Sequence, residues 1–427
     1  MRPITAILIG AGARGRMVYG RYAAQYPSEI KIVAVADPDR ERRQLAVEEH
    51  GIQAARSYIS WEQLLTGERI ADVAIIATQD KMHYSPVLKA LSLGYHILLE
   101  KPMSPSLTEV LDMAGAAKEQ GRMLTVCHVL RYTPFWSKIK ELLAGGAIGE
   151  IVSIQLSENV GYFHMAHSFV RGNWRSAAET SPMILQKSCH DMDLISWLMG
   201  KACLRVNSYG SLVHFRQEHA PQGAANRCTD GCPVERQCPY SAKKIYAEDP
   251  THEWSQFITH ELTEQGIMQA LQKGPFGRCV YRCDNDVVDH QVVNMEFEGG
   301  ATAAFTMSGF THECSRTIQV MGTHGEIRGH MEKGEIDLYP FGRKPVHYDI
   351  QGEGRHGGGD EQLMRSFVAQ VRAADIGGAA REQGLTSAEV SVQSHLMAFA
   401  AEQSRVAGGH SVEIKELLRR GSLTSAV

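Results

Sequence analysis

Residues 4–15, Ile4-Thr5-Ala6-Ile7-Leu8-Ile9-Gly10-Ala11-Gly12-Ala13-Arg14-Gly15, join a short apolar run to a G-x-G-x-x-G pattern. The apolar run is typical of a buried strand, and residues 16–26 are compatible with a helix. A second apolar run, residues 30–36, ends at Asp37, 22 residues after Gly15. In this arrangement the glycines let a pyrophosphate approach the helix N-terminus, and the acid binds a ribose hydroxyl. We therefore predict a dinucleotide site with contacts from Gly10, Gly12, Ala13, Arg14, Gly15 and Asp37; the alternative is a glycine-rich turn in another α/β protein.

Asp37 also bears on the choice of dinucleotide. A carboxylate at this position would repel a 2′-phosphate, so it favours NAD over NADP. Three nearby cations, Arg40, Arg42 and Arg43, weaken this preference.

Strand-like and helix-like segments continue to alternate after Asp37. Residues 72–78, 96–99 and 123–126 read as strands, and residues 86–93 and 107–119 as helices. This alternation predicts a doubly wound parallel sheet, an α/β fold. Short connections then place Thr78, His83, Lys101 and His128 at the carboxyl edge of the sheet, where ligands bind in such folds.

Three motifs resemble those of the Gfo/Idh/MocA oxidoreductase family. They are Gly10–Gly15, then Ala77-Thr78 with His83, then Glu100-Lys101-Pro102. The match spans residues 1–130 and continues more weakly at residues 146–151. It implies a Rossmann domain at 1–128 and, at 129–427, a C-terminal α+β domain with an open, mainly antiparallel sheet whose free face makes a homo-oligomer contact. It also implies that Thr78, His83, Glu100 and Lys101 contact an NAD or NADP cofactor.

The resemblance supplies the first catalytic candidates as well. Lys101 would lie beside the nicotinamide ribose and the substrate hydroxyl, where it stabilises an alkoxide or relays its proton. The family pattern of aspartate, histidine four positions on and aspartate three beyond matches here at His190 and Asp193, but Gln186 replaces the first aspartate. A spacing of four predicts Gln186 and His190 on one helical face. Lys187 and Asp191 have the same spacing and form either a helix ion pair or part of the pocket.

Residues 161–175 are rich in histidine, arginine and aromatic side chains. Carbohydrate sites combine aromatic faces with dense hydrogen-bonding groups, so we expect this segment to form a pocket wall; the alternative is a polar loop that braces the domain. The catalytic candidate from this segment is His164. The expected substrate contacts from this segment are His167, Arg171 and Trp174. The family resemblance implies further contacts from His128, Arg131, Tyr132 and Asp193, and His290, at the start of a later strand, is another candidate. Asp360 is expected to cap a helix over residues 361–372, with His356 nearby.

Nine cysteines are present, and three of them, Cys228, Cys232 and Cys238, lie within eleven residues. Spacings of two to four are typical of zinc ligands. Cys228 and Cys232 fit, whereas the gap to Cys238 is longer. A structural zinc that fastens an insertion at residues 215–280 is one hypothesis, with Cys283, Cys279 or His219 as the fourth ligand. An iron–sulfur centre and free or disulfide-linked thiols are the others.

Composition limits the partners. The chain has 427 residues, 43% of them hydrophobic and 22% charged, with a net charge of −4. No basic field favours nucleic acid. No apolar run approaches the roughly 20 residues that a membrane helix needs. The short first run is not a secretory leader, so a cytoplasmic protein is expected.

Three functions remain in view. The first is NAD-dependent oxidation of a ring hydroxyl of a sugar or glycoside, with Lys101 and His190 handling the proton. The second is a redox-neutral glycosidase or lyase that acts through a transient keto-sugar and elimination. The surplus of acid/base groups, among them His164, Asp191 and His290, motivates it. The third is a non-catalytic cofactor-binding regulator, suggested only by Gln186.

Overall fold

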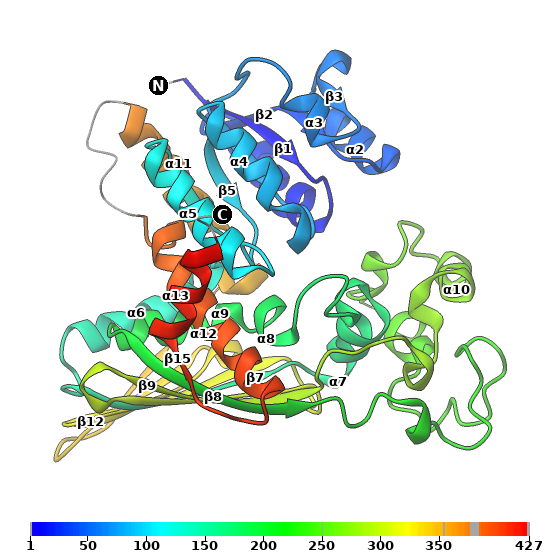
Figure 1. Ribbon diagram of the computed structural model, residues 1–427. Coiled ribbons are helices and arrows are strands. Elements are labelled where there is room, and N and C mark those ends of the chain that lie inside the picture. Colours follow the sequence, from blue (N-terminus) through cyan, green and yellow to red (C-terminus); the bar gives the residue numbers. More distant parts are fainter. Residues whose placement is uncertain (1, 250, 353–354, 376–383, 425–427) are drawn as a thin grey trace.

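Two β-sheets, one above the other in Figure 1, organise the chain. The computed structural model describes residues 2–249, 251–352, 355–375 and 384–424. Within these ranges no helix is long and apolar enough to cross a membrane.

The first sheet has six parallel strands in the order β3-β2-β1-β4-β5-β6. The predicted doubly wound parallel sheet is therefore confirmed. The order reverses between β1 and β4, and ligands bind at the carboxyl ends of the strands at such a switch point. The strands are β1 (Ile4–Ile9), β2 (Ile30–Ala36), β3 (Ser57–Tyr58), β4 (Val73–Ile76), β5 (His96–Leu99) and β6 (Leu124–Val126).

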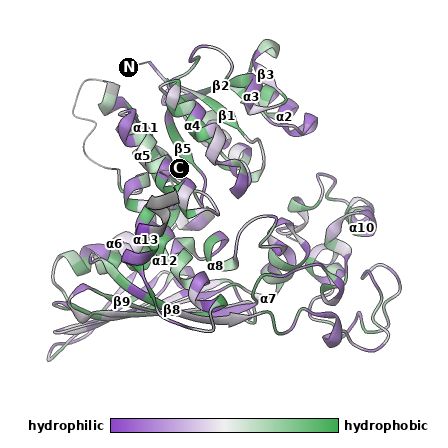
Figure 2. Cartoon of the chain, viewed as in Figure 1, coloured by the Kyte–Doolittle hydropathy of each residue, from purple (hydrophilic) through white to green (hydrophobic). Residues whose placement is uncertain are grey.

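Helices cover this sheet because its central strands are apolar on both faces. Every residue of β4 and β5 is buried. Figure 2 shows the hydrophobic colour on β1, β2 and β5. The helical segments that follow the strands are η1 (Gly15–Gly20), α1 (Arg21–Gln25), α2 (Arg40–His50), α3 (Trp61–Leu64), α4 (Tyr84–Ser92) and α5 (Leu107–Glu119).

The second sheet has nine strands in the order β14-β13-β12-β11-β7-β10-β9-β8-β15. Among the described strands only β7 and β10 pair in parallel, so the sheet is mainly antiparallel as expected. Its strands are β7 (Ile151–Asn159), β8 (Cys203–Ser211), β9 (His290–Phe297), β10 (Thr302–Ser308), β11 (Ser315–Gly322), β12 (Gly325–His330), β13 (Glu335–Pro340), β14 (Val346–Asp349) and β15 (Val412–Glu413).

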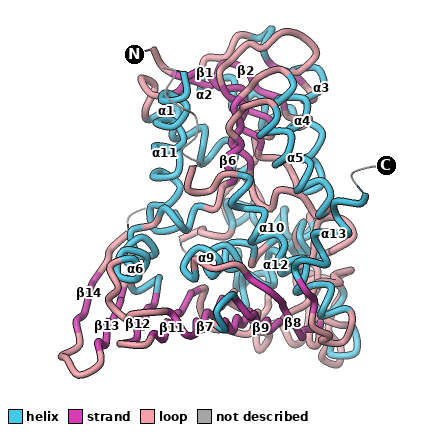
Figure 3. Tube along the Cα trace, turned by 60° about the vertical axis from the view of Figure 1, so that its left-hand side comes forward, coloured by secondary structure: helices cyan, strands magenta, loops and turns pink. Residues whose placement is uncertain are grey.

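One face of the second sheet is covered and the other is open, as Figure 3 shows from the side. Side chains alternate accordingly. In β9, Val293 and Met295 are buried, whereas Val292 and Asn294 are exposed. The helices on or beside the covered face are α6 (Pro134–Ala144), α8 (Met183–Gln186), α9 (Cys189–Met199), α12 (Ala388–Val406) and α13 (Ile414–Thr424). Helix α11 (Gly359–Asp375) lies beside the first sheet, where Glu361 binds Tyr26 and Arg372 binds the carbonyl oxygen of Ser28.

Helix α12 joins the two halves. It packs on β8 and α9 of the second sheet and on α5 of the first. Two backbone links secure its start, a hydrogen bond from Val126 N to Thr386 O and a bridge between Thr125 and Ser387. The start of α12 therefore lies at the carboxyl end of β6, the edge of the first sheet where ligands are expected.

The cysteine-bearing insertion lies between β8 and β9. It contains one α-helix of more than two turns, α10 (Glu264–Lys273), and several short turns. It extends to one side of the second sheet, where it meets α7 (Tyr162–His164) and the π-helical segment η5 (Met165–Arg171) (Figure 1).

Candidate active site

The glycine loop after β1 has the packing that a bound dinucleotide needs. Gly10 has φ +91°, and a Cβ there would lie 2.6 Å from the carbonyl oxygen of Ala77. A Cβ on Gly15 would lie 1.9 Å from the carbonyl oxygen of Gly10. A Cβ on Gly12 would meet only Arg42 Nη1, at 4.0 Å. Two glycines therefore pack the turn tightly and the third leaves open space, where a pyrophosphate fits.

Asp37 is fixed beside this loop. Its carboxylate accepts hydrogen bonds from the backbone N–H groups of Ala11, at 2.7 Å, and Asp39, at 2.8 Å. The side chain is buried at the end of β2. Arg43 donates to the carbonyl oxygen of Asp37, so one of the three cations noted in the sequence is already engaged there.

Arg14 and Glu100 bind each other rather than projecting separately. Arg14 Nε lies 2.5 Å from Glu100, and Arg14 Nη2 lies 2.8 Å from Asp360 at the start of α11. Tyr19 donates a short hydrogen bond to Glu100. Burial alone would raise the pKa of Glu100, but Arg14 and Tyr19 hold it below its ordinary value. The network ties the glycine loop to β5 and to the chain's C-terminal half.

Asp360 and His356 belong to the same network. His356 Nδ1 lies 2.9 Å from Asp360. The prediction that Asp360 caps a helix is wrong in detail, because α11 begins at Gly359 and Asp360 is its second residue. Its carboxylate instead pairs with Arg14.

His83 braces the turn after Lys101. The ring is fully buried, with Nδ1 2.9 Å from the carbonyl oxygen of Pro102 and Nε2 3.2 Å from that of Thr78. Both nitrogens are thus engaged with backbone. Thr78 remains partly exposed at the end of β4.

Lys101 reaches from the first sheet to the second half of the chain. Its Nζ donates a 2.7 Å hydrogen bond to the carbonyl oxygen of Gln186, at the end of α8. The Lys101–Pro102 peptide bond is cis. The ammonium group therefore lies at the carboxyl edge of β5, directly against the segment that leads to His190.

That segment is not the continuous helix that the spacing predicted. Helix α8 ends at Gln186 and α9 begins at Cys189, so Gln186 and His190 do not share one helical face. The Gln186 amide instead donates to the carbonyl oxygens of Trp174 and Ser181, and its Oε1 is buried without a partner among the described residues. The break releases the carbonyl oxygen of Gln186 to bind Lys101.

His190 lies in a row of three imidazoles. The ring centroids of His190 and His128 are 5.8 Å apart, as are those of His128 and His395. Burial lowers the pKa of His190 and of His128, and the positive charge of Lys101 lowers both further. His190 is therefore neutral at neutral pH and able to accept a proton.

His395 anchors the far end of this row. Its Nε2 accepts a 2.9 Å hydrogen bond from Met103 N, and its Nδ1 lies 2.8 Å from the carbonyl oxygen of Ser391. Burial lowers the pKa of His395 to about 3. The row thus connects α9 to the turn after Lys101 through α12.

Lys187 and Asp191 have different partners, so of the two alternatives the helix ion pair is wrong. Lys187 Nζ lies 3.0 Å from Glu158 on β7, and Asp191 lies 2.8 Å from Arg316 Nε on β11. Arg316 also lies 2.5 Å from Glu158. The four charges form one buried network, in which burial raises the pKa of Asp191 to about 6.

Arg131 and Asp193 form a buried pair beside His128. Arg131 binds both carboxylate oxygens of Asp193, at 2.6 and 2.7 Å, and also the carbonyl oxygen of Leu385. The hydroxyl of Tyr132 lies 3.2 Å from Thr386 Oγ1. These predicted substrate contacts are engaged in joining α9 and the start of α12.

The aromatic segment divides between two surroundings. His164 Nδ1 lies 3.7 Å from Cys314 Sγ. Burial lowers the pKa of His164, and the positive charges of Lys187 and Arg316 lower it further. His167 stacks on Phe276 of the insertion at 4.7 Å and binds the Tyr246 hydroxyl. His164 therefore lies beside the charge network, and His167 holds the insertion.

Trp174 and Arg171 also lie in different surroundings. The Trp174 side chain is 37% exposed, and its carbonyl oxygen binds Gln186. Arg171 is fully buried and points toward Tyr240 and Cys228. Trp174 thus stays near the candidate site, while Arg171 belongs to the insertion.

His290 lies on the open face of the second sheet. It begins β9 and shares the alternation of exposed Val292 and Asn294. Its Nδ1 lies 2.9 Å from Asp289, which is buried and accepts from Val213 N and His214 N. The two side chains therefore contact each other instead of pointing to opposite faces of a strand, because β9 begins only at His290 and Asp289 precedes it.

Zinc finds no support. Among the described residues, no group of three or more His, Cys, Asp and Glu side chains could hold a metal ion. All nine cysteines are free. The hypothesis of a structural zinc is therefore not supported.

Sequence reasoning did not identify Glu158, Arg316 or His395. Glu158 and Arg316 are charged residues at positions where the alternation of β7 and β11 calls for buried side chains. They are register partners on adjacent strands. A charge on the apolar side of a strand was the available signal. His395 lies in α12, a helix of mixed polar and apolar residues, and its sequence gave no signal of a role in the site.

Comparison with known proteins places this geometry in a family. A family model described as "Oxidoreductase family, NAD-binding Rossmann fold" matches residues 4–128. A second, described as "Oxidoreductase family, C-terminal alpha/beta domain", matches residues 140–405.

Among curated proteins, the putative oxidoreductase YteT of Bacillus subtilis is 27% identical over 315 residues, which cover 69% of this chain and 72% of that protein. The 2,7-anhydro-N-acetylneuraminate hydratase of Escherichia coli is 27% identical over 215 residues, 48% of this chain and 54% of that protein.

Among solved structures, an inositol dehydrogenase homolog from Azotobacter vinelandii, complexed with NADH and myo-inositol, aligns with TM-score 0.70 and 17% identity over 96% of this chain and 98% of that one. An oxidoreductase from Agrobacterium radiobacter, in complex with NAD+, L-tartaric acid and magnesium, aligns with TM-score 0.69 and 17% identity over 97% and 99%. At these identities the structures establish the fold alone.

Proposed function

The chain belongs to the Gfo/Idh/MocA oxidoreductase family, and from this premise we propose that it is an NAD-dependent enzyme that oxidises a ring hydroxyl of a sugar, cyclitol or glycoside. The observation that carries the proposal is the contact between Lys101 and the α8–α9 segment. A cation from the cofactor edge and a neutral histidine, His190, thereby face the same site.

The residues divide the work. The neutral imidazole of His190 takes the proton of the substrate hydroxyl, and the Lys101 ammonium stabilises the negative charge that develops on the oxygen. A nicotinamide bound at the glycine loop would accept the hydride from the same carbon. The carbonyl oxygen of Gln186 positions Lys101. The His190 ring packs edge-on against His128, which in turn packs against His395. Trp174 offers an exposed apolar face to the substrate.

NAD is the proposed cofactor. Gly10, Gly12 and Gly15 shape the pyrophosphate loop, with Ala13 and Arg14 inside it, and Asp37 meets the ribose. The relatives bound to NADH and to NAD+ support this choice.

A panel assay tests the proposal. Purified protein and NAD are mixed with cyclitols, free sugars and glycosides, and reduced nicotinamide is followed by its absorbance. Reduction with at least one of these compounds, abolished in Lys101→Ala and in His190→Ala, is the expected result. Normal NAD binding without any reduction across the panel would overturn it.

A redox-neutral reaction is the second candidate. Elimination from a keto-sugar needs another acid/base group besides Lys101 and His190. Asp191, with its pKa raised to about 6 by burial, and His164 lie in or beside the Glu158–Arg316 network and could supply it. One relative is named a hydratase, and the addition of water is a reaction without net oxidation. An assay with a chromogenic glycoside distinguishes the redox-neutral route from net oxidation. Release of the aglycone without accumulation of reduced cofactor supports the redox-neutral route.

Two further features are proposed. The open face of the second sheet carries Tyr209 and its strand neighbour Val292, 55% and 38% exposed, and we propose that a second copy of the chain covers it. The free thiols are consistent with action in the cytoplasm.

A further inference from the structure

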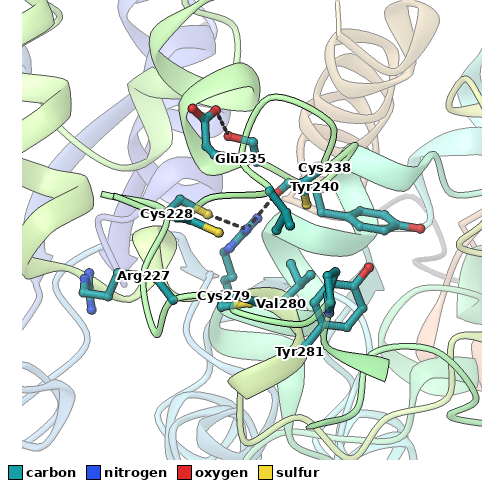
Figure 4. Close-up of a pocket in the computed structure, with 15 residues that line it drawn as sticks. Arg227, Cys228, Glu235, Cys238, Tyr240, Cys279, Val280 and Tyr281 are labelled. Carbon is teal, nitrogen blue, oxygen red and sulfur yellow. Dashed lines mark hydrogen bonds between the residues drawn. The ribbon is translucent and has the colours of Figure 1, made fainter. Parts of the chain in front are cut away.

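Four thiols of the insertion meet around one pocket. Cys228, Cys232, Cys238 and Cys279 all line it. Figure 4 shows Cys228, Cys238 and Cys279 approaching it from different sides. The first three belong to one loop, and Cys279 comes from a segment more than forty residues further along the chain. Cys283, which the sequence also offered, does not line this pocket.

Backbone pairing brings the distant segment to the loop. Arg227 and Arg278 form an antiparallel bridge, with hydrogen bonds from Cys228 N to Gly277 O at 2.9 Å and from Cys279 N to Asn226 O at 2.8 Å. Cys228 and Cys279 are therefore held on two paired loop segments by backbone hydrogen bonds and do not depend on a disulfide.

A buried cation faces the thiols without a full set of partners. Arg171, fully buried, also lines the pocket. Its Nε and Nη2 donate to the carbonyl oxygens of Arg278 and Tyr240, and Nη2 lies 3.8 Å from Cys228 Sγ. Its Nη1 is buried with no partner among the described residues. A buried N–H group without an acceptor is costly, and within the described part of the chain no carboxylate pairs with Arg171, so an anion beside Nη1 would stabilise the pocket.

The other donors point to sulfur as the acceptor. Ala242 N lies 3.3 Å from Cys228 Sγ. Glu235, the one carboxylate lining this pocket, is already bound by Ser241 Oγ at 2.8 Å, with Lys243 at 3.8 Å. Neither His nor Asp lines the pocket. The ligand set is thus four cysteines, and two N–H groups, from Ala242 and Arg171, are directed at the sulfur of one of them, Cys228.

We propose that this pocket binds an iron–sulfur cluster through Cys228, Cys232, Cys238 and Cys279. Four cysteine thiolates are the usual ligands of both [2Fe–2S] and [4Fe–4S] clusters. A single zinc ion lies about 2.3 Å from each sulfur that binds it. Among the described residues, no three His, Cys, Asp or Glu side chains form a group that could hold a single metal ion. A cluster spaces its four thiolates more widely, and its net negative charge gives Arg171 the missing partner.

The cluster would fasten the insertion to η5. Arg171 ends η5, the segment that also carries His167, and Arg278 Nη2 donates back to the carbonyl oxygen of Arg171 at 3.1 Å. This site is separate from Lys101 and His190, and the proposal does not rest on the proposed function.

Metal analysis of the full chain tests the proposal. The protein is purified without oxygen, reconstituted with ferrous iron and sulfide, and desalted. We expect about two or four iron atoms per chain, with matching acid-labile sulfide and a visible charge-transfer band. Protein that takes up no iron and sulfide, or that contains zinc alone, or that forms disulfides among these cysteines, would overturn it.

Single variants locate the ligands. Cys228→Ser, Cys232→Ser, Cys238→Ser and Cys279→Ser should each lose most of the iron, whereas Cys283→Ser, in the same insertion, should retain it. Equal loss in Cys283→Ser and Cys279→Ser would contradict the assignment. If the four variants do not fold, the iron and sulfide content of the unmodified chain decides alone.

Discussion

The Nζ of Lys101 donates a 2.7 Å hydrogen bond to the main-chain carbonyl oxygen of Gln186. The contact crosses from the edge of the first sheet to the segment that carries His190. It exists because α8 stops at Gln186 and leaves that carbonyl oxygen outside a helix. The site therefore depends on a helix break as much as on the two side chains.

Lys101→Ala should lower kcat by about 10²-fold or more, the range typical of a lost acid/base or charge-stabilising group. NAD binding, measured by fluorescence titration, should remain within a few-fold of the unmodified protein. Lys118→Ala, an exposed lysine on α5, is the control and should retain full activity. Unchanged kcat in Lys101→Ala would instead favour a regulator without catalysis.

The pH profile should report the neutrality of His190. Because burial and Lys101 lower its pKa, the imidazole remains neutral below the ordinary histidine value of about 6.5. The rate should hold steady as pH falls to that value and decline only at lower pH, as His190 takes up a proton. His190→Asn should lose about 10²-fold in kcat and lack this acid limb. An acid limb centred above the ordinary histidine pKa would contradict the assignment.

Asp37→Ser should relax the preference for NAD over NADP. Removing the carboxylate removes its repulsion of a 2′-phosphate. If this lowers the free energy of NADP binding by about 1.4 kcal/mol, the affinity for NADP rises roughly tenfold. The ratio of kcat/KM for the two cofactors measures it. Asp39→Ala, which removes the neighbouring helix cap, should leave the ratio unchanged. The prediction fails if both variants shift the ratio equally.

Asp191→Asn should destabilise the fold by about 3 kcal/mol, because it removes a carboxylate that pairs with a buried arginine, Arg316. Urea denaturation measures the change. Glu361→Gln breaks an exposed pair with Arg365 of similar length, 2.7 Å, and should cost less than about 1 kcal/mol. Similar losses in the two variants would mean that the buried network contributes no more than a surface pair.

The fold was largely predictable because its signals are local. The run from Ile4 to Gly15, and the apolar segments that follow, specify a parallel sheet through period and glycine placement. The second sheet and its place in the chain came from family resemblance rather than from periodicity.

The site was less predictable because its contacts join distant segments. Spacing suggested that Lys187 would pair with Asp191, but the helix break turns Lys187 toward Glu158. Residue type suggested that Arg171 would contact substrate, and family resemblance suggested the same of Arg131. Each is instead buried among partners far along the chain. Charged side chains in a sequence do not reveal which of them are already satisfied.

The most direct measurement follows the nicotinamide rapidly after mixing NAD-loaded protein with cyclitols, sugars and glycosides. Rapid observation detects lasting reduction and also the transient reduction of a redox-neutral cycle. The account predicts a rise in reduced nicotinamide with at least one compound, absent in Lys101→Ala and His190→Ala. NAD bound at the glycine loop, with no reduction at any time for any of these compounds, would contradict it.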